Sequence, residues 1–197
     1  MNDADANSPL RVRCEAVLRG LMTAVWGIRV TGLERVPLSG PLLVACNHVS
    51  LMDPPLLGVA IAPSRRPFGL GKKELYENPL IGRFLRGMGS IPLDRRGDVT
   101  AMRGALDLLE RGGCLMIFPE GTRVGPGERR QPKPGVAFLS ARSGAKVVPA
   151  RVLGTAEFPR RFPLEVRFGT PMEPPPSDDR ETGLTYARAV MDAVYKL

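Results

Sequence analysis

Residues 41–54 read PLLVACNHVSLMDP, an apolar run that passes abruptly into polar residues. The run from Pro41 to Cys46 has the length and unbroken hydrophobicity of a strand buried on both faces. Pro54 suits the first turn of a helix, so residues 47–53 are expected to form the loop between that strand and that helix. A strand, a loop and a helix in this order are typical of an α/β protein.

The same alternation continues along the chain. Further strands are expected at 67–70, 90–93, 114–118, 146–153 and 164–168, and helices at 54–61, 78–88, 98–111, 136–142 and 185–196. This order predicts a single α/β domain over residues 27–197, with a mixed, mostly parallel sheet flanked by helices.

The segment before this domain is amphipathic. Between Val12 and Val30 its apolar residues recur at helical spacing, at Cys14, Val17, Leu18, Leu21, Val25 and Ile28. Four charged residues within it make a membrane span a poor interpretation. Residues 1–26 are therefore expected to form an N-terminal amphipathic helix, with no signal peptide. Two placements stay open: packing on its own domain, or lying in a membrane interface with its arginines against anionic head groups.

Composition narrows the classes of partner. Among 197 residues, 28 Lys and Arg against 20 Asp and Glu give a formal charge of +8. Such a charge favours anionic partners such as lipid head groups or phosphorylated molecules. Aromatic residues are only 6% and do not alternate with basic ones, which argues against nucleic acid. Three separated cysteines and one histidine give no disulfide framework or metal-site pattern, so neither a metal nor a cofactor is expected.

The only histidine of the chain, His48, directly follows the buried strand. Loops at the carboxyl ends of parallel strands form the ligand crevice of α/β proteins. A turn over residues 48–53 can bring Asp53 back to the imidazole, and a carboxylate there would fix the tautomer and support a general base. Asp53 can equally be the N-cap of the next helix, and a carboxylate has enough acceptor sites for both roles.

Two more loops follow apolar strands in the same way. Arg95 lies just beyond the strand at 90–93, and Glu120, Gly121, Thr122 and Arg123 lie just beyond the strand at 114–118. If the strands are parallel neighbours, these loops share one edge with His48. Guanidinium groups match phosphate oxygens, and a glycine lets backbone N–H groups approach an anion. The alternative is that these arginines are ordinary solvated loop residues.

Four blocks of sequence carry a family resemblance. They comprise Asn47, His48, Ser50 and Asp53 with His-x4-Asp spacing; Gly89, Ile91 and Arg95, preceded by Lys72, Glu74 and Leu75; residues 118–123, Phe-Pro-Glu-Gly-Thr-Arg; and Val148, Pro149 and Ala150. Together they resemble the lysophospholipid acyltransferase superfamily, in particular its PlsC-like 1-acylglycerol-3-phosphate acyltransferases, over roughly residues 26–170. The resemblance implies a glycerol-3-phosphate acyltransferase-like fold.

The resemblance also implies a reaction. His48 would be the general base and Asp53 would orient it, while the hydroxyl of an acceptor attacks the thioester of acyl-CoA or acyl-carrier protein without an acyl-enzyme. The expected acceptor is 1-acylglycerol-3-phosphate, giving phosphatidic acid in phospholipid biosynthesis; glycerol-3-phosphate or another lysolipid is the alternative. Arg95, Glu120, Gly121, Thr122 and Arg123 would bind the acceptor phosphate, with Glu120 orienting Arg95 or Arg123.

Three further expectations concern Lys72, the location and competing functions. Lys72 is either an oxyanion donor or a solvated lysine at a strand end. The enzyme is expected at the cytoplasmic face of the membrane, attached peripherally to anionic lipid.

Cys46 lies two residues before His48, which allows a Cys–His thioesterase or acyl-cysteine transferase. A non-catalytic protein that binds anionic lipid is the alternative of another class.

Overall fold

The computed structural model describes residues 9–87, 89–93, 99–125, 127–160 and 163–197. Within them one seven-stranded sheet runs in the order β1-β7-β6-β2-β5-β3-β4. The strands are β1 (Arg29–Thr31), β2 (Leu42–Cys46), β3 (Phe68–Lys72), β4 (Ser90–Leu93), β5 (Cys114–Ile117), β6 (Lys146–Leu153) and β7 (Glu165–Phe168). Each hydrogen-bonded pair is parallel except β6 with β7, which confirms the mixed, mostly parallel α/β sheet.

Strand β2 lies at the centre of the sheet, and this position explains why its sequence is apolar throughout. It pairs with β5 on one side and β6 on the other, and all five of its residues are buried. Leu42, Val44 and Cys46 face one core, whereas Leu43 and Ala45 face the other. A strand covered on both faces must be apolar at successive positions.

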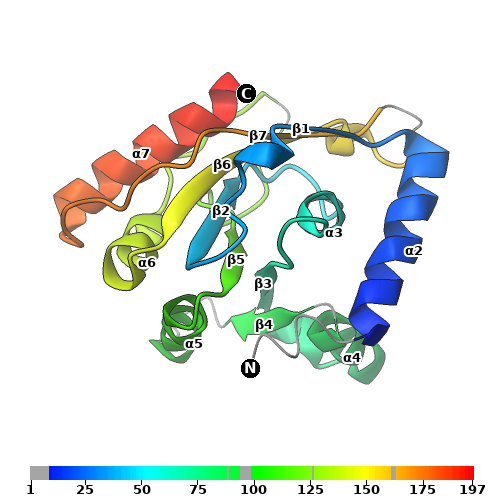
Figure 1. Cartoon of the computed structure of the whole chain (residues 1–197), viewed down its shortest axis with the longest axis horizontal. Coiled ribbons are helices and arrows are strands. Elements are labelled where there is room, and N and C mark those ends of the chain that lie inside the picture. The colour runs from blue at the N-terminus through cyan, green and yellow to red at the C-terminus, as the bar shows by residue number, and fades with distance from the viewer. Residues whose placement is uncertain (1–8, 88, 94–98, 126, 161–162) are drawn as a thin grey trace.

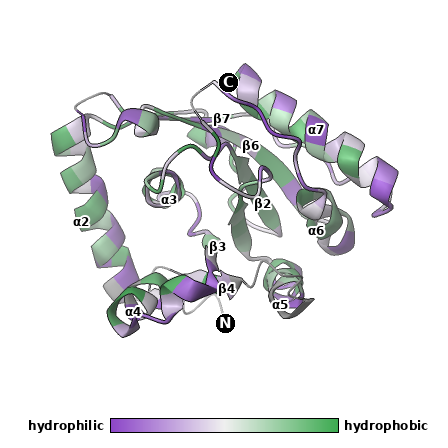
Figure 2. Cartoon of the chain, turned by 180° about the vertical axis from the view of Figure 1, so that it is seen from behind, coloured by the Kyte–Doolittle hydropathy of each residue, from purple (hydrophilic) through white to green (hydrophobic). Residues whose placement is uncertain are grey.

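Helices cover both faces of the sheet (Figure 1). Their bounds are α2 (Pro9–Trp26), α3 (Asp53–Ile61), α4 (Pro79–Gly87), α5 (Val99–Glu110), α6 (Gly135–Ser143) and α7 (Arg180–Lys196), with short 3-10 turns η1 (Leu33–Arg35), η2 (Lys73–Tyr76) and η3 (Thr155–Glu157). The core on one face contains α3 and Met22 of α2. The core on the other face is formed with α5, α6 and α7. Figure 2 shows the hydrophobic colouring gathered in the central strands.

The N-terminal helix ends at Trp26, Gly27 takes a φ of 63°, and β1, a strand that the sequence did not predict, begins at Arg29. One predicted boundary was wrong. The last helix begins at Arg180 rather than Thr185. There the side chain of Asp179 accepts hydrogen bonds from the backbone N–H groups of Glu181 and Thr182, which is a standard N-cap.

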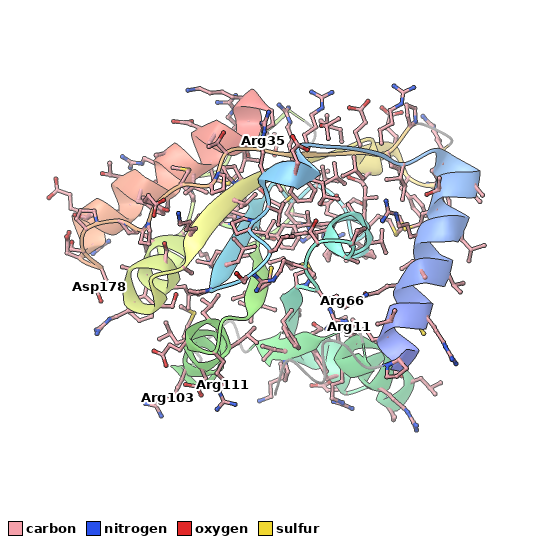
Figure 3. All side chains as sticks on the ribbon, in the orientation of Figure 1. Arg11, Arg35, Arg66, Arg103, Arg111 and Asp178 are labelled. Carbon is pink, nitrogen blue, oxygen red and sulfur yellow. The ribbon has the colours of Figure 1, made fainter. Side chains whose placement is uncertain are left out.

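Helix α2 has one face against the domain and one face in solvent. Arg11 and Glu15 are buried, and Glu15 also holds Arg66 at 3.0 Å, so charged side chains dock the helix near β3 (Figure 3). Val17, Leu21 and Val25 stay exposed, at 62%, 58% and 41%. The structure therefore shows packing on the domain and, beside it, a free apolar stripe. Within the described residues, no helix combines the length and apolar character needed to cross a bilayer.

Candidate active site

The carboxyl ends of β2, β5 and β6 meet at one edge of the sheet, because these three strands are parallel. His48 follows β2, Glu120 follows β5, and Thr155 follows β6. The backbone N–H of Val124 also donates to the carbonyl of His48 at 2.9 Å, which ties the loop after β5 to the loop after β2. The expectation that these two loops share an edge is confirmed. Arg95, in the loop after β4, lies outside the described residues.

Asn47 anchors the start of the His48 loop. Its amide oxygen accepts the N–H of Val152 at 2.8 Å, and its amide nitrogen donates to the Val152 carbonyl at 3.0 Å. The side chain thus prolongs the pairing of β2 with β6 beyond the end of the strand. His48 consequently leaves the sheet at a fixed point.

His48 is held on two sides. Its Nδ1 lies 2.9 Å from Oδ2 of Asp53, and its ring stacks on Phe118 with centroids 4.4 Å apart. The side chain is 14% exposed. No hydrogen bond to Nε2 is formed by the described residues, so that nitrogen is available to a substrate.

Two compatible roles were expected of Asp53, orienting His48 and capping the next helix; the structure shows the contact with His48 and no cap. Asp53 is the first residue of α3, whose N-cap is Met52, and no side-chain capping bond is present there. The Asp53 Oδ2 instead accepts the upstream N–H groups of Val49 and Ser50 at 2.6 and 2.7 Å. Its Oδ1 accepts the hydroxyl of Thr155 at 2.5 Å. The fully buried carboxylate thus closes the loop that carries His48.

Glu120 is buried beside this loop. One carboxylate oxygen accepts the backbone N–H of His48 at 2.6 Å, and the other accepts the hydroxyl of Tyr195. Burial raises the pKa of Glu120, and the hydrogen bonds from Tyr195 and His48 act in the opposite direction. Glu120 was expected to orient Arg95 or Arg123, but in the described part of the chain its contacts are with His48 and Tyr195.

The rest of the Phe-Pro-Glu-Gly-Thr-Arg segment forms a tight turn. The N–H of Gly121 donates to the Phe118 carbonyl at 2.9 Å, and its φ of 70° is a backbone conformation that favours glycine. A Cβ at this position would also lie 2.7 Å from Cε of Lys133, so the lysine side chain lies against the turn. Thr122 is half-buried and Arg123 is exposed. The turn therefore presents polar groups and cations to solvent next to His48.

Lys72 and Cys46 were the other candidate residues. Lys72 ends β3, two strand positions from β2, and pairs with Glu74 at 3.6 Å. Cys46 is fully buried, and burial together with the charge of Asp53 raises the pKa of its thiol well above the usual range. A buried, protonated thiol is a poor nucleophile, which argues against the Cys–His alternative.

A pocket of about 320 Å³ opens on the α7 side of this edge. Asn47, Val49 and Glu120 are among its lining residues. Arg129, Arg151 and Tyr195 line it as well. The pocket therefore connects the backbone that surrounds His48 with the last turn of α7.

Sequence reasoning missed Thr155, Tyr195 and Lys133. Thr155 had a usable signal, because it follows an apolar strand in the same way as His48 and Glu120. Tyr195 had none: it lies in a helix, 75 residues from its partner Glu120. Only the packing of α7 against β6 and β2 brings the two together.

Comparisons with known proteins identify the family of this chain. A 1-acyl-sn-glycerol-3-phosphate acyltransferase of Bacillus subtilis is 28% identical, over 88% of this chain and 90% of its own. The chloroplastic enzyme LPAT1 of Arabidopsis thaliana is 32% identical over 66% of this chain, which spans 37% of that longer protein. The crystal structure of PlsC, the 1-acyl-sn-glycerophosphate acyltransferase of Thermotoga maritima, superposes with a TM-score of 0.75 at 25% identity, covering 94% of this chain and 78% of its own. Residues 27–153 match the family described as Acyltransferase. Since these residues are more than half of the chain, the chain belongs to that family.

Proposed function

We propose that this acyltransferase transfers a fatty acyl group from acyl-CoA or acyl-carrier protein to the free hydroxyl of 1-acylglycerol-3-phosphate, giving phosphatidic acid. The observation that carries the proposal is the pair of His48 and the buried Asp53, 2.9 Å apart, with Nε2 available. The acceptor class follows from the named activity of the relatives in Bacillus subtilis and Arabidopsis thaliana.

The geometry supports general-base catalysis. The Asp53 carboxylate accepts a hydrogen bond from the Nδ1–H of His48, so Nε2 bears the lone pair that takes the proton of the acceptor hydroxyl. The hydroxyl oxygen then attacks the thioester carbonyl carbon, and the tetrahedral intermediate collapses with cleavage of the C–S bond. The leaving thiolate takes the proton back from the imidazolium, which restores neutral His48. No group of the protein is acylated in this sequence.

The turn at residues 121–123 is the proposed site for the acceptor phosphate, together with Arg95. Arg123 is exposed there, and the bend at Gly121 places backbone groups at the surface of the same turn. A guanidinium can hold a phosphate with two parallel hydrogen bonds. Glu120 acts through its contact with the His48 backbone and does not touch the phosphate.

The enzyme is proposed to work as a peripheral protein on anionic membrane, at the cytoplasmic face. Both acceptor and product are amphiphiles, so the reacting hydroxyl lies near the interface. Leu51, in the loop between His48 and Asp53, is 69% exposed, which places an apolar side chain beside the reacting groups. The exposed stripe of α2 and a charge of +8 supply further apolar and electrostatic attraction.

The test is an assay of the purified chain with acyl-CoA and a panel of acceptors, with products identified by mass spectrometry. We expect phosphatidic acid from 1-acylglycerol-3-phosphate, and a loss of about 10²–10⁴-fold in His48→Ala. Cys46→Ala is the control, since the thiol has no part in this mechanism. Full activity in His48→Ala would contradict the general-base role, and consumption of a different acceptor would correct the substrate. Vesicle binding without thioester consumption would favour the non-catalytic alternative.

A further inference from the structure

We infer that Tyr195, in the last turn of α7, is a positioning residue for the acyl transfer: through the Glu120 carboxylate it holds the backbone of His48 in place. This inference rests on the proposed role of His48 as general base. Tyr195 lies outside the four blocks that carry the family resemblance and outside the residues matched by the family.

The contact runs through one carboxylate. The Tyr195 hydroxyl donates to Oε1 of Glu120, and Oε2 of Glu120 accepts the backbone N–H of His48 at 2.6 Å. Glu120 is completely buried, so water does not replace a lost donor easily. A carboxylate whose two oxygens both accept hydrogen bonds is held in one orientation. The backbone N–H of His48, which donates to this carboxylate, is held in place with it.

Tyr195, at the far end of this hydrogen-bonded connection, is itself held by other contacts. The Tyr195 ring lies under the guanidinium of Arg129, with the guanidinium carbon 4.5 Å from the ring centroid. The Tyr195 carbonyl accepts a hydrogen bond from Arg151 of β6 at 2.6 Å. Burial and the neighbouring carboxylate both raise the pKa of Tyr195, so the hydroxyl keeps its proton and acts as a donor. The tyrosine is therefore a rigid support for Glu120.

Tyr195 also lines the pocket, so direct contact with substrate is the competing role. The two roles predict different kinetics. A substrate contact in the pocket would change KM, whereas support of the base would change kcat, because the substrates still bind while the imidazole is displaced. Tyr195→Phe separates them, since it removes the hydroxyl and keeps both the ring under Arg129 and the carbonyl bonded to Arg151.

The chain offers a matched control and an independent probe. Tyr186 lies on the same helix and donates its hydroxyl to the Glu173 carbonyl at 2.8 Å, so Tyr186→Phe removes a similar bond elsewhere. His48 is the single histidine, and its imidazole Cε1–H therefore gives one assignable NMR signal. The chemical shift of this signal at fixed pH reports the ring's surroundings without any substrate.

We expect Tyr195→Phe to lower kcat about tenfold, since a 1 Å misplacement of reacting groups can cost about 10²-fold. Both KM values should stay at the parent value, and the His48 signal should move. In Tyr186→Phe, kcat, KM and the signal should match the parent. Circular dichroism and melting temperature establish that both variants are folded.

Several results would overturn the inference: a parent-like kcat in Tyr195→Phe, a rise in KM with kcat unchanged, an unmoved His48 signal, or the same change in Tyr186→Phe. Loss of the native melting transition in Tyr195→Phe would overturn it too, because the hydroxyl would then support the whole fold. The His48→Ala assay tests the general-base role separately from the role of Tyr195. Retained activity there contradicts the general-base role, whereas an inactive His48→Ala with a parent-like Tyr195→Phe contradicts only the role of Tyr195.

Discussion

Both oxygens of the Asp53 side chain are occupied, and their partners come from two distant parts of the chain. Oδ2 accepts the N–H groups of Val49 and Ser50 next to the His48 ring, while Oδ1 accepts the hydroxyl of Thr155 from the turn after β6. A buried carboxylate is costly unless its acceptor sites are filled. Thr155 therefore contributes to stability as well as to the shape of the site.

Thr155→Val should destabilise the chain by about 1–3 kcal/mol, the usual cost of a buried polar group that has lost its partner. Thr155→Ser keeps the hydroxyl and should remain closer to the parent. Thermal unfolding of the three proteins measures this, and for a chain of this size each kcal/mol corresponds to about 2–4 °C. A parent-like Val variant beside a destabilised Ser variant would show that the methyl group, and not the hydroxyl, is important.

Glu120→Gln should make the stability less sensitive to pH. Burial is the main cause that raises the folded pKa of Glu120 above its ordinary value. The folded chain therefore binds more protons than the unfolded chain between the two values, and its stability falls as pH rises through that interval. Glutamine has no proton to lose, and its amide can still accept from the His48 N–H and donate to the Tyr195 oxygen.

Melting temperatures of parent and Glu120→Gln, measured from about pH 4 to pH 8, test this prediction. The difference should shift in favour of Glu120→Gln as pH rises. A difference that is constant with pH, or that shifts toward the parent, would contradict the raised pKa.

At the scale of elements, helix α2 packs on the domain through one face and exposes apolar side chains on another. Arg11, Glu15 and Met22 are buried toward the domain, and Val17, Leu21 and Val25 are exposed next to them. Because side chains four apart share a helix face, the exposed three form a stripe. Folding and membrane contact can therefore be tested separately on this helix.

The variant Leu21→Asp/Val25→Asp should bind anionic vesicles more weakly and stay folded, since both positions are exposed. Its matched control is Ala16→Asp/Thr23→Asp, which adds the same charge to the same helix at exposed positions away from the stripe. Vesicle pelleting at low and high salt gives the affinities, and circular dichroism confirms the fold. Equal weakening in both double variants would mean that only charge is involved and that the stripe has no membrane contact.

Elements whose formation depends on local burial could be predicted from sequence. Strand β2 is covered on both faces, so its five residues form an unbroken apolar run. Strand β1 has three residues, and it exists because β7 pairs with it from more than a hundred positions away. Contacts between distant parts of the sequence limit the prediction of the site in the same way. The spacing of His48 and Asp53 suggested their pairing, whereas the hydrogen bond from Thr155 that holds the Asp53 carboxylate could not be read from that spacing.

At the scale of the whole molecule, the segment after Leu153 completes the fold. Strand β7 lies between β1 and β6, and Ala187, Val190 and Val194 of α7 are buried. The family match stops at residue 153, yet the sheet order and both cores include residues beyond it.

A chain cut after residue 153 should therefore fail to give a cooperative melting transition, because β1 loses its partner and one face of β6 and β2 is uncovered. Circular dichroism and thermal unfolding of the truncated and full chains make the comparison. Adding a separate peptide of residues 154–197 should restore part of the transition. A stable, cooperative 1–153 fragment would show that β7 and α7 are dispensable for folding.

The meeting of early and late residues at one sheet edge has a consequence for biosynthesis. A ribosome that has passed residue 123 has already made His48, Asp53 and the Phe-Pro-Glu-Gly-Thr-Arg segment. Thr155 and Tyr195, which hold Asp53 and Glu120, are translated later, and Tyr195 is among the last residues of the sequence. Once residue 150 is made, a nascent chain thus contains all four blocks before His48 and Asp53, the proposed catalytic pair, have these supports. The proposed supports of the site are therefore synthesised after the motifs, so on this proposal acyl transfer cannot begin before Tyr195 has been translated.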